Sequence, residues 1–398
     1  MTRKIIALIG LALLAGCSGG GGDSATPSSA PAPLAQPDIL TATDQGLQRG
    51  KANGEEQRLV FARPDLDFLF MALSHGHVFY AQDFDIWAVR TDGTEARQIV
   101  GTHNIGGIEA TNGPWLILRT QAVQPSGSIV DDLRSLDFET GTQFQLDDPG
   151  GTQFRAQNER RLISFSDKQI SSITNMGTDR LTYDKRTGPG GVFFSPLQIV
   201  DNMLIYSRDT QTFMIPLGGG TARLLDEARY DTYSAWSIGD RLIYHRRLSS
   251  GPPEADVVSI RTNGTDRIVL TTHPANEAVQ GTVGNLVLIR RNLTGHDELF
   301  TVPVTGGPER LLMTGLTDSD HIILTTDTHA IVGRPTGVWT VDMGGTLNQI
   351  SEIDTHFVAM IVGNALCFNH AGAAYCAPLD GSSPAVKIAN EGKVVGVL

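Results

Sequence analysis

The stretch DIWAVRTDGTEARQI, residues 85–99, contains the unit that the rest of the chain repeats. Ile86 and Val89 belong to a short strand, Asp92-Gly93 follows as a tight turn, and a second strand ends at Ile99. Alternation of apolar and polar residues directs one side of a strand toward a core, and Asp-Gly permits the positive φ angles of a hairpin turn. The stretch therefore predicts a β-hairpin.

Related hairpins recur to the end of the chain. Aligned turn glycines are separated by 48, 36, 42, 45, 42, 38 and 37 residues, close to the ~40–45 residues of a four-stranded propeller blade. A small turn and an apolar strand precede each hairpin, as in GDRLIY at 239–244, so each unit contains four strands. The aligned glycines are Gly93, Gly141, Gly177, Gly219, Gly264, Gly306, Gly344 and Gly381.

Eight such units, from about Leu66 to Asn390, predict an all-β fold. We expect a single closed β-propeller of eight four-stranded blades, with seven blades as the other count considered, because closure leaves only short protected edges. An open solenoid is the alternative, although nothing resembles a polar terminal cap. Residues 58–61 and 393–398 predict two further strands, one of which would close the ring across its seam.

The N-terminus has a separate composition. Arg3 and Lys4 precede an apolar run of ten residues and the sequence LAGC ending at Cys17, which resembles a bacterial lipoprotein signal. This resemblance implies a signal peptide over residues 1–16, lipid on Cys17 and a membrane anchor. An ordinary secretory signal is the alternative. The Gly, Ser, Ala and Pro that follow predict a flexible linker over residues 17–55, and the propeller domain would occupy residues 56–398.

Charge argues against one class of partner. The formal net charge of the chain is −12, and removal of residues 1–16 with Arg3 and Lys4 makes it −14. An acidic domain repels phosphate backbones, so nucleic acid is not expected as a partner.

Two of the three cysteines lie symmetrically about a turn. Cys367 and Cys376 flank Ala371-Gly372 at equal distances and would face each other across a hairpin. With a two-residue turn they form a non-hydrogen-bonded pair whose Cα atoms lie ~4.5 Å apart, within the range for a disulfide. Export to an oxidising compartment favours the bond. Two reduced, buried thiols are the alternative.

Basic residues recur at one equivalent place near the end of the second strand in five successive units. In a propeller these positions form an arc on one side of the ring, which we call the basic arc, and arginine suits the capture of carboxylates. The alternative is structural, in which each arginine pairs with a carboxylate or carbonyl of the neighbouring blade. The arc comprises Arg208, Arg246, Arg291, Arg334 and His370 at that place, together with Arg247 beside Arg246.

The hairpins resemble the repeats of TolB-type β-propellers. Trp87-x-Val89-x-x-Asp92-Gly93-x-x-x-Arg97 and Trp339-x-Val341-x-x-Gly344-Gly345 carry the resemblance, which covers the whole expected domain. It implies a propeller fold rather than a particular activity. Ser-Pro-Asp-Gly turns of that family are replaced here by Gly-Asp, Gly-Asn or Asp-Asn. The likeness extends to oligogalacturonate lyases built on such propellers, which use channel histidines and a divalent metal.

Together these patterns favour a lipoprotein that binds another envelope protein or an anionic glycan through one propeller face. We expect a monomer anchored at the outer membrane and facing the periplasm, with no catalytic residue, metal or cofactor. A metal-dependent glycan lyase is the alternative, with His273 or His321 as metal ligands. The pair His75 and His77 lacks a third ligand of useful spacing.

Overall fold

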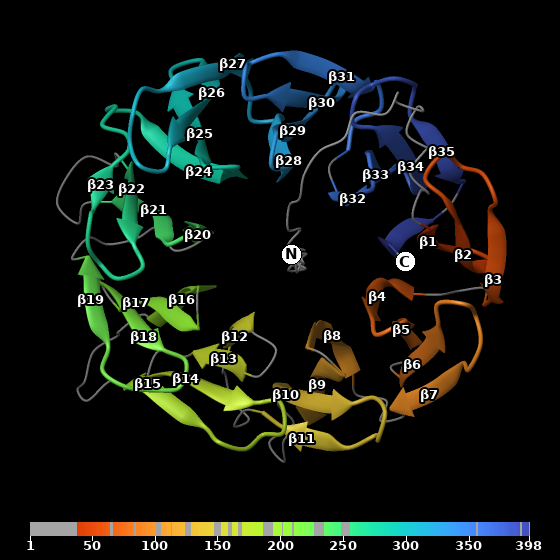
Figure 1. The fold of residues 1–398 in the computed structure, drawn as a ribbon. Helices are drawn as coiled ribbons and strands as arrows, with labels where there is room; N and C mark the ends of the chain where they lie inside the picture. The colour runs from red at the N-terminus through yellow and green to blue at the C-terminus, as the bar shows by residue number, and fades with distance from the viewer. Residues whose placement is uncertain are drawn as a thin grey trace, which may run out of the picture.

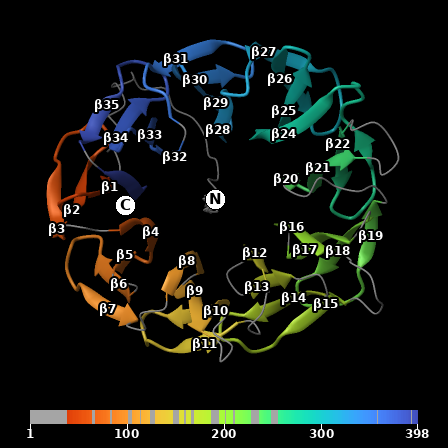
Figure 2. The same ribbon diagram turned by 180° about the vertical axis from the view of Figure 1, so that it is seen from behind.

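The structure is a computed structural model in which residues 38–397 are described with internal gaps. Every secondary-structure element in the described residues is a β-strand, and the 36 strands form nine four-stranded antiparallel sheets. Figure 1 shows the nine sheets as blades around a central axis, and Figure 2 shows the ring from behind. No helix in these ranges is a candidate for a membrane span. The gaps lie at 64–66, 83–84, 101–104, 113, 124–128, 147–152, 158–160, 166–168, 186–193, 201, 209–210, 227–234, 248–254, 356 and 391.

We name the strands of each blade A to D from the axis outward. Blade 1 takes its A strand from the end of the chain, and its strands in the order A to D are β36 (Lys393–Val397), β1 (Asp38–Thr43), β2 (Gly46–Lys51) and β3 (Arg58–Ala62). Blades 2 to 4 are β4 (Asp67–Ser74), β5 (His77–Gln82), β6 (Asp85–Arg90), β7 (Arg97–Val100); β8 (Ile105–Asn112), β9 (Trp115–Val123), β10 (Ile129–Asp137), β11 (Gln143–Gln145); and β12 (Gln153–Gln157), β13 (Arg161–Phe165), β14 (Gln169–Thr174), β15 (Leu181–Lys185).

The remaining blades follow in chain order. Blades 5 and 6 are β16 (Phe194–Val200), β17 (Met203–Arg208), β18 (Gln211–Pro216), β19 (Arg223–Asp226); and β20 (Ala235–Ile238), β21 (Arg241–Arg247), β22 (Ala255–Arg261), β23 (Ile268–Val269). Blades 7 to 9 are β24 (Asn276–Val283), β25 (Leu286–Leu293), β26 (His296–Pro303), β27 (Arg310–Leu316); β28 (His321–Thr325), β29 (His329–Arg334), β30 (Gly337–Asp342), β31 (Leu347–Ser351); and β32 (Phe357–Val362), β33 (Ala365–His370), β34 (Ala373–Pro378), β35 (Val386–Ala389).

The blade count differs from the expected eight. The ninth blade is blade 1, whose strands β1 and β2 lie within residues 17–55, where the sequence predicts a flexible linker. The expected boundary at residue 55 is therefore too late for this part of the chain, because Ile39, Leu40 and Leu47 are fully buried. Residues 1–37, with Cys17, lie outside the described residues.

Both expected seam strands exist, but they have different roles. The C-terminal strand β36 pairs with β1 and closes the ring, since Ile39 lies opposite Val397 and Ala42 opposite Lys393. The strand predicted at 58–61 is β3, the outermost strand of the same blade.

Connections divide the ring into two faces. Turns between strands A and B and between strands C and D lie on one side, which we call the A–B face. Turns between strands B and C and the connections between blades lie on the other, which we call the B–C face. This follows from the antiparallel order of every blade.

The core lies between the blades rather than at the centre of the ring. Among the described residues there are nine clusters of buried apolar side chains, and each joins two neighbouring blades. Strand β17 shows the principle: Leu204 and Tyr206 pack toward blade 4, whereas Ile205 between them packs toward blade 6. Because a strand alternates its side chains between two buried faces, the B strands are continuously apolar.

The hairpin that repeats has a bulge rather than a two-residue turn. In blade 2, the Gly93 amide donates to the Arg90 carbonyl at 2.8 Å and the Arg90 amide donates to the Thr94 carbonyl at 3.0 Å. Gly93 has a φ of 87°, whereas Asp92 is not among the residues with positive φ. This geometry is a type I turn followed by a glycine bulge.

Candidate binding face

The structure places the basic arc on the B–C face of five consecutive blades. Its residues lie at or near the last position of the B strands β17, β21, β25, β29 and β33. Figure 1 shows these strands following one another around one half of the ring. The side chains of Arg246 and Arg247 are outside the described part, so the geometry below concerns the other four members.

Arg208 is held between a carboxylate and an aromatic ring. Its Nη1 donates to Asp184 Oδ2 at 2.7 Å, and its guanidinium lies 4.3 Å from the centroid of Phe213. Asp184 belongs to β15, the outermost strand of the preceding blade, and also accepts a hydrogen bond from the Tyr206 hydroxyl at 3.0 Å. Burial raises the pKa of Tyr206 well above its ordinary value, and the Asp184 charge raises it further. The tyrosine therefore stays a hydrogen-bond donor at physiological pH.

Arg334 and His370 have the same type of partner. Arg334 Nε donates to Asp320 Oδ1 at 3.0 Å, and His370 Nδ1 lies 2.8 Å from Asp354 Oδ1. Each aspartate lies in the segment that connects the preceding blade to the blade of its basic partner. The ends of strand B and of the preceding strand D thus meet at this face.

Arg291 differs because it is buried. Its side chain is 9% exposed, its guanidinium lies 4.2 Å from the Phe300 ring centroid, and it contacts two carboxylates, Glu277 at 2.6 Å and Glu309 at 2.7 Å. The Glu277 side chain is fully buried, and its Oε2 has no hydrogen-bond partner in the described residues. Burial raises the pKa of Glu277, although hydrogen bonds from Thr271 and Arg291 act in the opposite direction. Arg291 is therefore part of the packing of blade 7.

The described members of the arc are accordingly paired with carboxylates. For Arg208, Arg334 and His370 these come from the preceding blade or its connection, as the structural alternative of the sequence analysis requires. Two arginines nevertheless keep donors. Within the described residues, Arg208 uses one guanidinium nitrogen and Arg334 uses Nε, so the other N–H groups of these half-buried side chains are available. A fixed guanidinium with free donors can bind a second carboxylate.

Arginines of the repeated hairpin connect blades at the outer rim. Arg97 Nη2 donates to the Phe138 carbonyl of the next blade at 2.8 Å, and Arg310 Nη2 donates to the Gly344 carbonyl of the next blade at 3.1 Å. The motif that carries the TolB-type resemblance is therefore an inter-blade contact.

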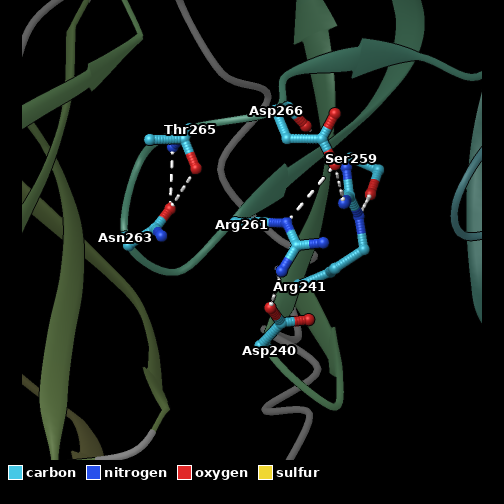
Figure 3. A network of polar contacts seen from close by, with 7 residues as sticks. All are labelled: Asp240, Arg241, Ser259, Arg261, Asn263, Thr265 and Asp266. Atoms are coloured by element: carbon cyan, nitrogen blue, oxygen red, sulfur yellow. Dashed lines mark hydrogen bonds and ion pairs between the residues drawn. The ribbon is translucent and has the colours of Figure 1, made fainter.

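A second arginine network on the A–B face was missed by the sequence analysis. Arg241 donates to Ser259 Oγ at 2.7 Å and to Asp266 Oδ2 at 2.6 Å, while Arg261 contacts the same carboxylate at 3.3 Å (Figure 3). Arg241 is buried. Blade 4 repeats the network with Arg161, Ser172 and Asp179. A signal was available, because Gly-Thr-Asp follows the turn at 177–179 and again at 264–266.

Cys367 and Cys376 form a disulfide in the structure. They are directly opposite each other in the pairing of β33 with β34, with Cα atoms 4.1 Å apart. Both belong to the core cluster between blade 9 and blade 1.

Histidines do not gather into a site in the described residues. No group of three or more His, Cys, Asp or Glu side chains able to hold a metal occurs there. His75 and His77 lie against Phe138, with ring centroids 6.2 and 5.4 Å away, and the His273 ring accepts a hydrogen bond from the Ala275 amide.

Comparison with known proteins supports the fold class. No protein-family model and no curated protein matches the sequence. A crystal structure of the eukaryotic initiation factor has a TM-score of 0.62 at 9% identity, covering 91% of this chain and 98% of its own. BamB from Moraxella catarrhalis has a TM-score of 0.47 at 13% identity and coverages of 77% and 95%. TolB from Acinetobacter baumannii has a TM-score of 0.33 at 11% identity and coverages of 71% and 82%.

The chain also resembles two larger peptidases, a prolyl endopeptidase and the tricorn protease, but spans only 48% and 47% of their lengths. The similarity to the initiation factor structure, at 9% identity, shows the fold alone. The described residues form a nine-bladed β-propeller, and TolB and BamB are among the solved structures that it resembles.

Proposed function

We propose that this chain is a lipid-anchored propeller of the cell envelope that binds another envelope protein through its B–C face. The lipoprotein-like sequence LAGC ending at Cys17 supports the anchor and the envelope location. A rigid ring that displays loops on one face supports a binding role, since loops on a fixed scaffold commonly carry binding residues. An acidic polysaccharide is the other partner considered.

The observation that carries the proposal is that the guanidinium groups of Arg208 and Arg334 are fixed and, within the described residues, still have free N–H groups. Each guanidinium is fixed by one carboxylate, at 2.7 and 3.0 Å, and keeps N–H groups without a partner in the described residues. A preorganised donor loses little conformational entropy on binding. A carboxylate on a partner would then share each guanidinium.

Photo-crosslinking in intact cells tests this proposal. A photoreactive amino acid is placed at Thr294 or Thr336, exposed positions in B–C turns of blades 7 and 8, and at Asn285 in an A–B turn as control. We expect an adduct of defined mass from the two B–C positions and none from Asn285. The adduct should fall at least about tenfold in an Arg208→Ala, Arg334→Ala variant, because each charged hydrogen bond contributes about 1.5–3 kcal/mol.

Three results would contradict the proposal. One is equal adduct formation from Asn285, and another is an adduct that the double substitution does not affect. The third concerns the anchor. If the full-length protein is released from membranes to the same extent as a Cys17→Ala variant, Cys17 does not anchor the chain. An adduct sensitive to glycan hydrolysis instead of protease would identify the partner as a polysaccharide.

A further inference from the structure

The closure of the ring determines where the N-terminal segment leaves it. Blade 1 receives its A strand from the C-terminus, so the first described strand, β1, is a B strand and begins on the A–B face. Asp38 lies opposite Lys51, beside the turn between strands C and D of blade 1. The last described residue, Val397, pairs with Ile39 and lies at the same face.

The exit point is held in place by ion pairs. The Asp38 carboxylate accepts a hydrogen bond from Arg49 Nε at 2.5 Å and another from Lys51 Nζ. These bonds, together with both flanking charges, hold the pKa of Asp38 below its ordinary value. Asp38 is therefore fixed on the A–B face, and the chain that precedes it joins the ring at this point.

Arg208, Arg334 and His370 lie at the opposite ends of B strands, on the B–C face. A B strand of six residues separates the two faces by about 20 Å. The chain between Cys17 and Asp38 contains 20 residues, and its 21 peptide units span at most about 70 Å.

We infer that the protein is anchored by its A–B face and presents its B–C face away from the membrane. This inference rests on the proposed function, because it takes Cys17 as the anchor, and it adds the side from which the partner approaches. The partner is a protein surface that lies off the lipid bilayer. Lipid headgroups of the anchoring membrane are, on this inference, not the ligand of Arg208 and Arg334.

Tether length makes the inference testable. If the B–C face is to reach the bilayer, the chain that precedes Asp38 must first pass the two outer strands of blade 1, a distance of about 10 Å. It must then run about 20 Å along the outer edge of the blade, from the A–B face to the B–C face. Deletion of residues 23–34 leaves 8 residues before Asp38, or at most about 30 Å of chain. The shortened chain has no length to spare for contact between the B–C face and lipid.

The experiment compares two probes on the same blade. Glu55→Cys lies in the turn between β2 and β3 on the A–B face, and Asp44→Cys lies in the turn between β1 and β2 on the B–C face. Both positions are exposed, and both substitutions remove one negative charge. A donor fluorophore is attached at either site of the 23–34 deletion variant. Energy transfer is then measured to a headgroup-labelled acceptor in phosphatidylethanolamine–phosphatidylglycerol vesicles.

Because the two probes lie about 20 Å apart along β2, we expect transfer to be at least about twofold higher from position 55 than from position 44. The difference in energy transfer between the two positions should be smaller with the full-length tether. Equal transfer from both positions, or higher transfer from position 44, in the shortened variant would overturn the inference.

Failure of the anchor is distinguished by a second way of attachment. Lipid-bearing protein purified from membranes is compared with unlipidated protein carrying a hexahistidine tag in place of Cys17 on vesicles with a nickel-chelating lipid. If only the tagged protein associates with vesicles, the proposed anchor is wrong. The probe comparison on the nickel vesicles still decides whether a chain attached before Asp38 presents the B–C face outward.

Discussion

At the residue scale, the arginines of this propeller differ in burial more than in partners. Arg241 and Arg261 share the Asp266 carboxylate, but their side chains are 3% and 44% exposed. A buried guanidinium has exchanged its water for protein acceptors, whereas an exposed one can return to water at little cost. The two residues therefore provide a matched comparison (Figure 3).

We predict that Arg241→Ala destabilises the protein by about 2–3 kcal/mol, because charged hydrogen bonds to Ser259 and to the Asp266 carbonyl are lost from a buried site. Arg261→Ala should cost less than about 1 kcal/mol. Urea denaturation of the two variants under identical conditions measures the difference. Equal losses would show that the burial of Arg241 has no energetic consequence.

Glu277 gives a pH dependence with a definite sign. Burial raises its pKa in the folded state above the ordinary value of 4.5. In the window between these two values the folded state binds more protons than the unfolded state, so this group makes stability fall as pH rises. Glu277→Gln removes the ionisation. The stability of the variant relative to the wild type should therefore increase from pH 4.5 to pH 7.5.

Thermal unfolding across that pH range tests this prediction. Glu309→Gln serves as the control, since it removes the other carboxylate at Arg291 from a more exposed position. A relative stability of Glu277→Gln that falls with rising pH would reverse the sign and refute the assignment.

Sequence reasoning located residues but not their partners. The repeat of the B strand was sufficient to place Arg208, Arg334 and His370 at equivalent ends. Asp184, Asp320 and Asp354 could not be assigned to them, because each comes from the preceding blade or its connection and the pairing depends on how the blades pack. The sequence pattern is compatible with arginines that pair structurally, but the partner of each arginine and the distance to it follow only from the fold.

At the element scale, the C–D hairpin has two functions. It connects two strands, and its glycine approaches the D strand of the preceding blade. A Cβ on Gly93 would lie 1.7 Å from the Val60 carbonyl oxygen, whereas a Cβ on Gly141 would meet nothing within 4 Å. Both glycines have positive φ, 87° and 74°. The pair therefore separates the cost of backbone conformation from the cost of the inter-blade contact.

We predict that Gly141→Ala costs about 1–2 kcal/mol, the penalty of a left-handed conformation. Gly93→Ala should cost at least about 1–3 kcal/mol more, because the backbone of blade 1 must move. Melting temperatures of the two variants provide the measurement. Similar losses at both positions would mean that the contact with Val60 relaxes freely.

The hairpin also explains why one blade was missed. Gly54 has a φ of 83°, and its amide donates to the Lys51 carbonyl, as the Gly93 amide does to Arg90. Gly54 lies 39 residues before Gly93, a spacing within the observed range of the repeat. Its neighbours Ala52, Asn53 and Glu55 lack the apolar alternation that identified the other hairpins. A continuous Gly, Ser, Ala and Pro composition upstream extended the predicted linker over β1 and β2.

At the scale of the whole molecule, stability depends on inter-blade cores that follow one another around the ring, nine of them in the described residues. The core between blades 9 and 1 combines Ile39 and Ala52 with Cys367, Cys376 and other residues of the last blade. The core between blades 1 and 2 includes Leu40, Ala42 and Leu47. Both cores therefore depend on the strands that the sequence analysis placed in the linker.

We predict that a chain beginning at Asp38 unfolds cooperatively at nearly the same temperature as the full-length protein, whereas a chain beginning at residue 56 does not fold to a closed ring. The shorter chain lacks β1 and β2, so β36 and β3 lose their pairing partners. Ile39, Leu40 and Leu47 are each at most 1% exposed, and the burial of such a side chain contributes about 1.5–3 kcal/mol. Their combined loss approaches the 5–15 kcal/mol that stabilises an ordinary domain.

Circular dichroism melts and size-exclusion chromatography of the two chains test the ninth blade directly. Equal stability of both chains would restore the eight-bladed ring with a boundary at residue 55.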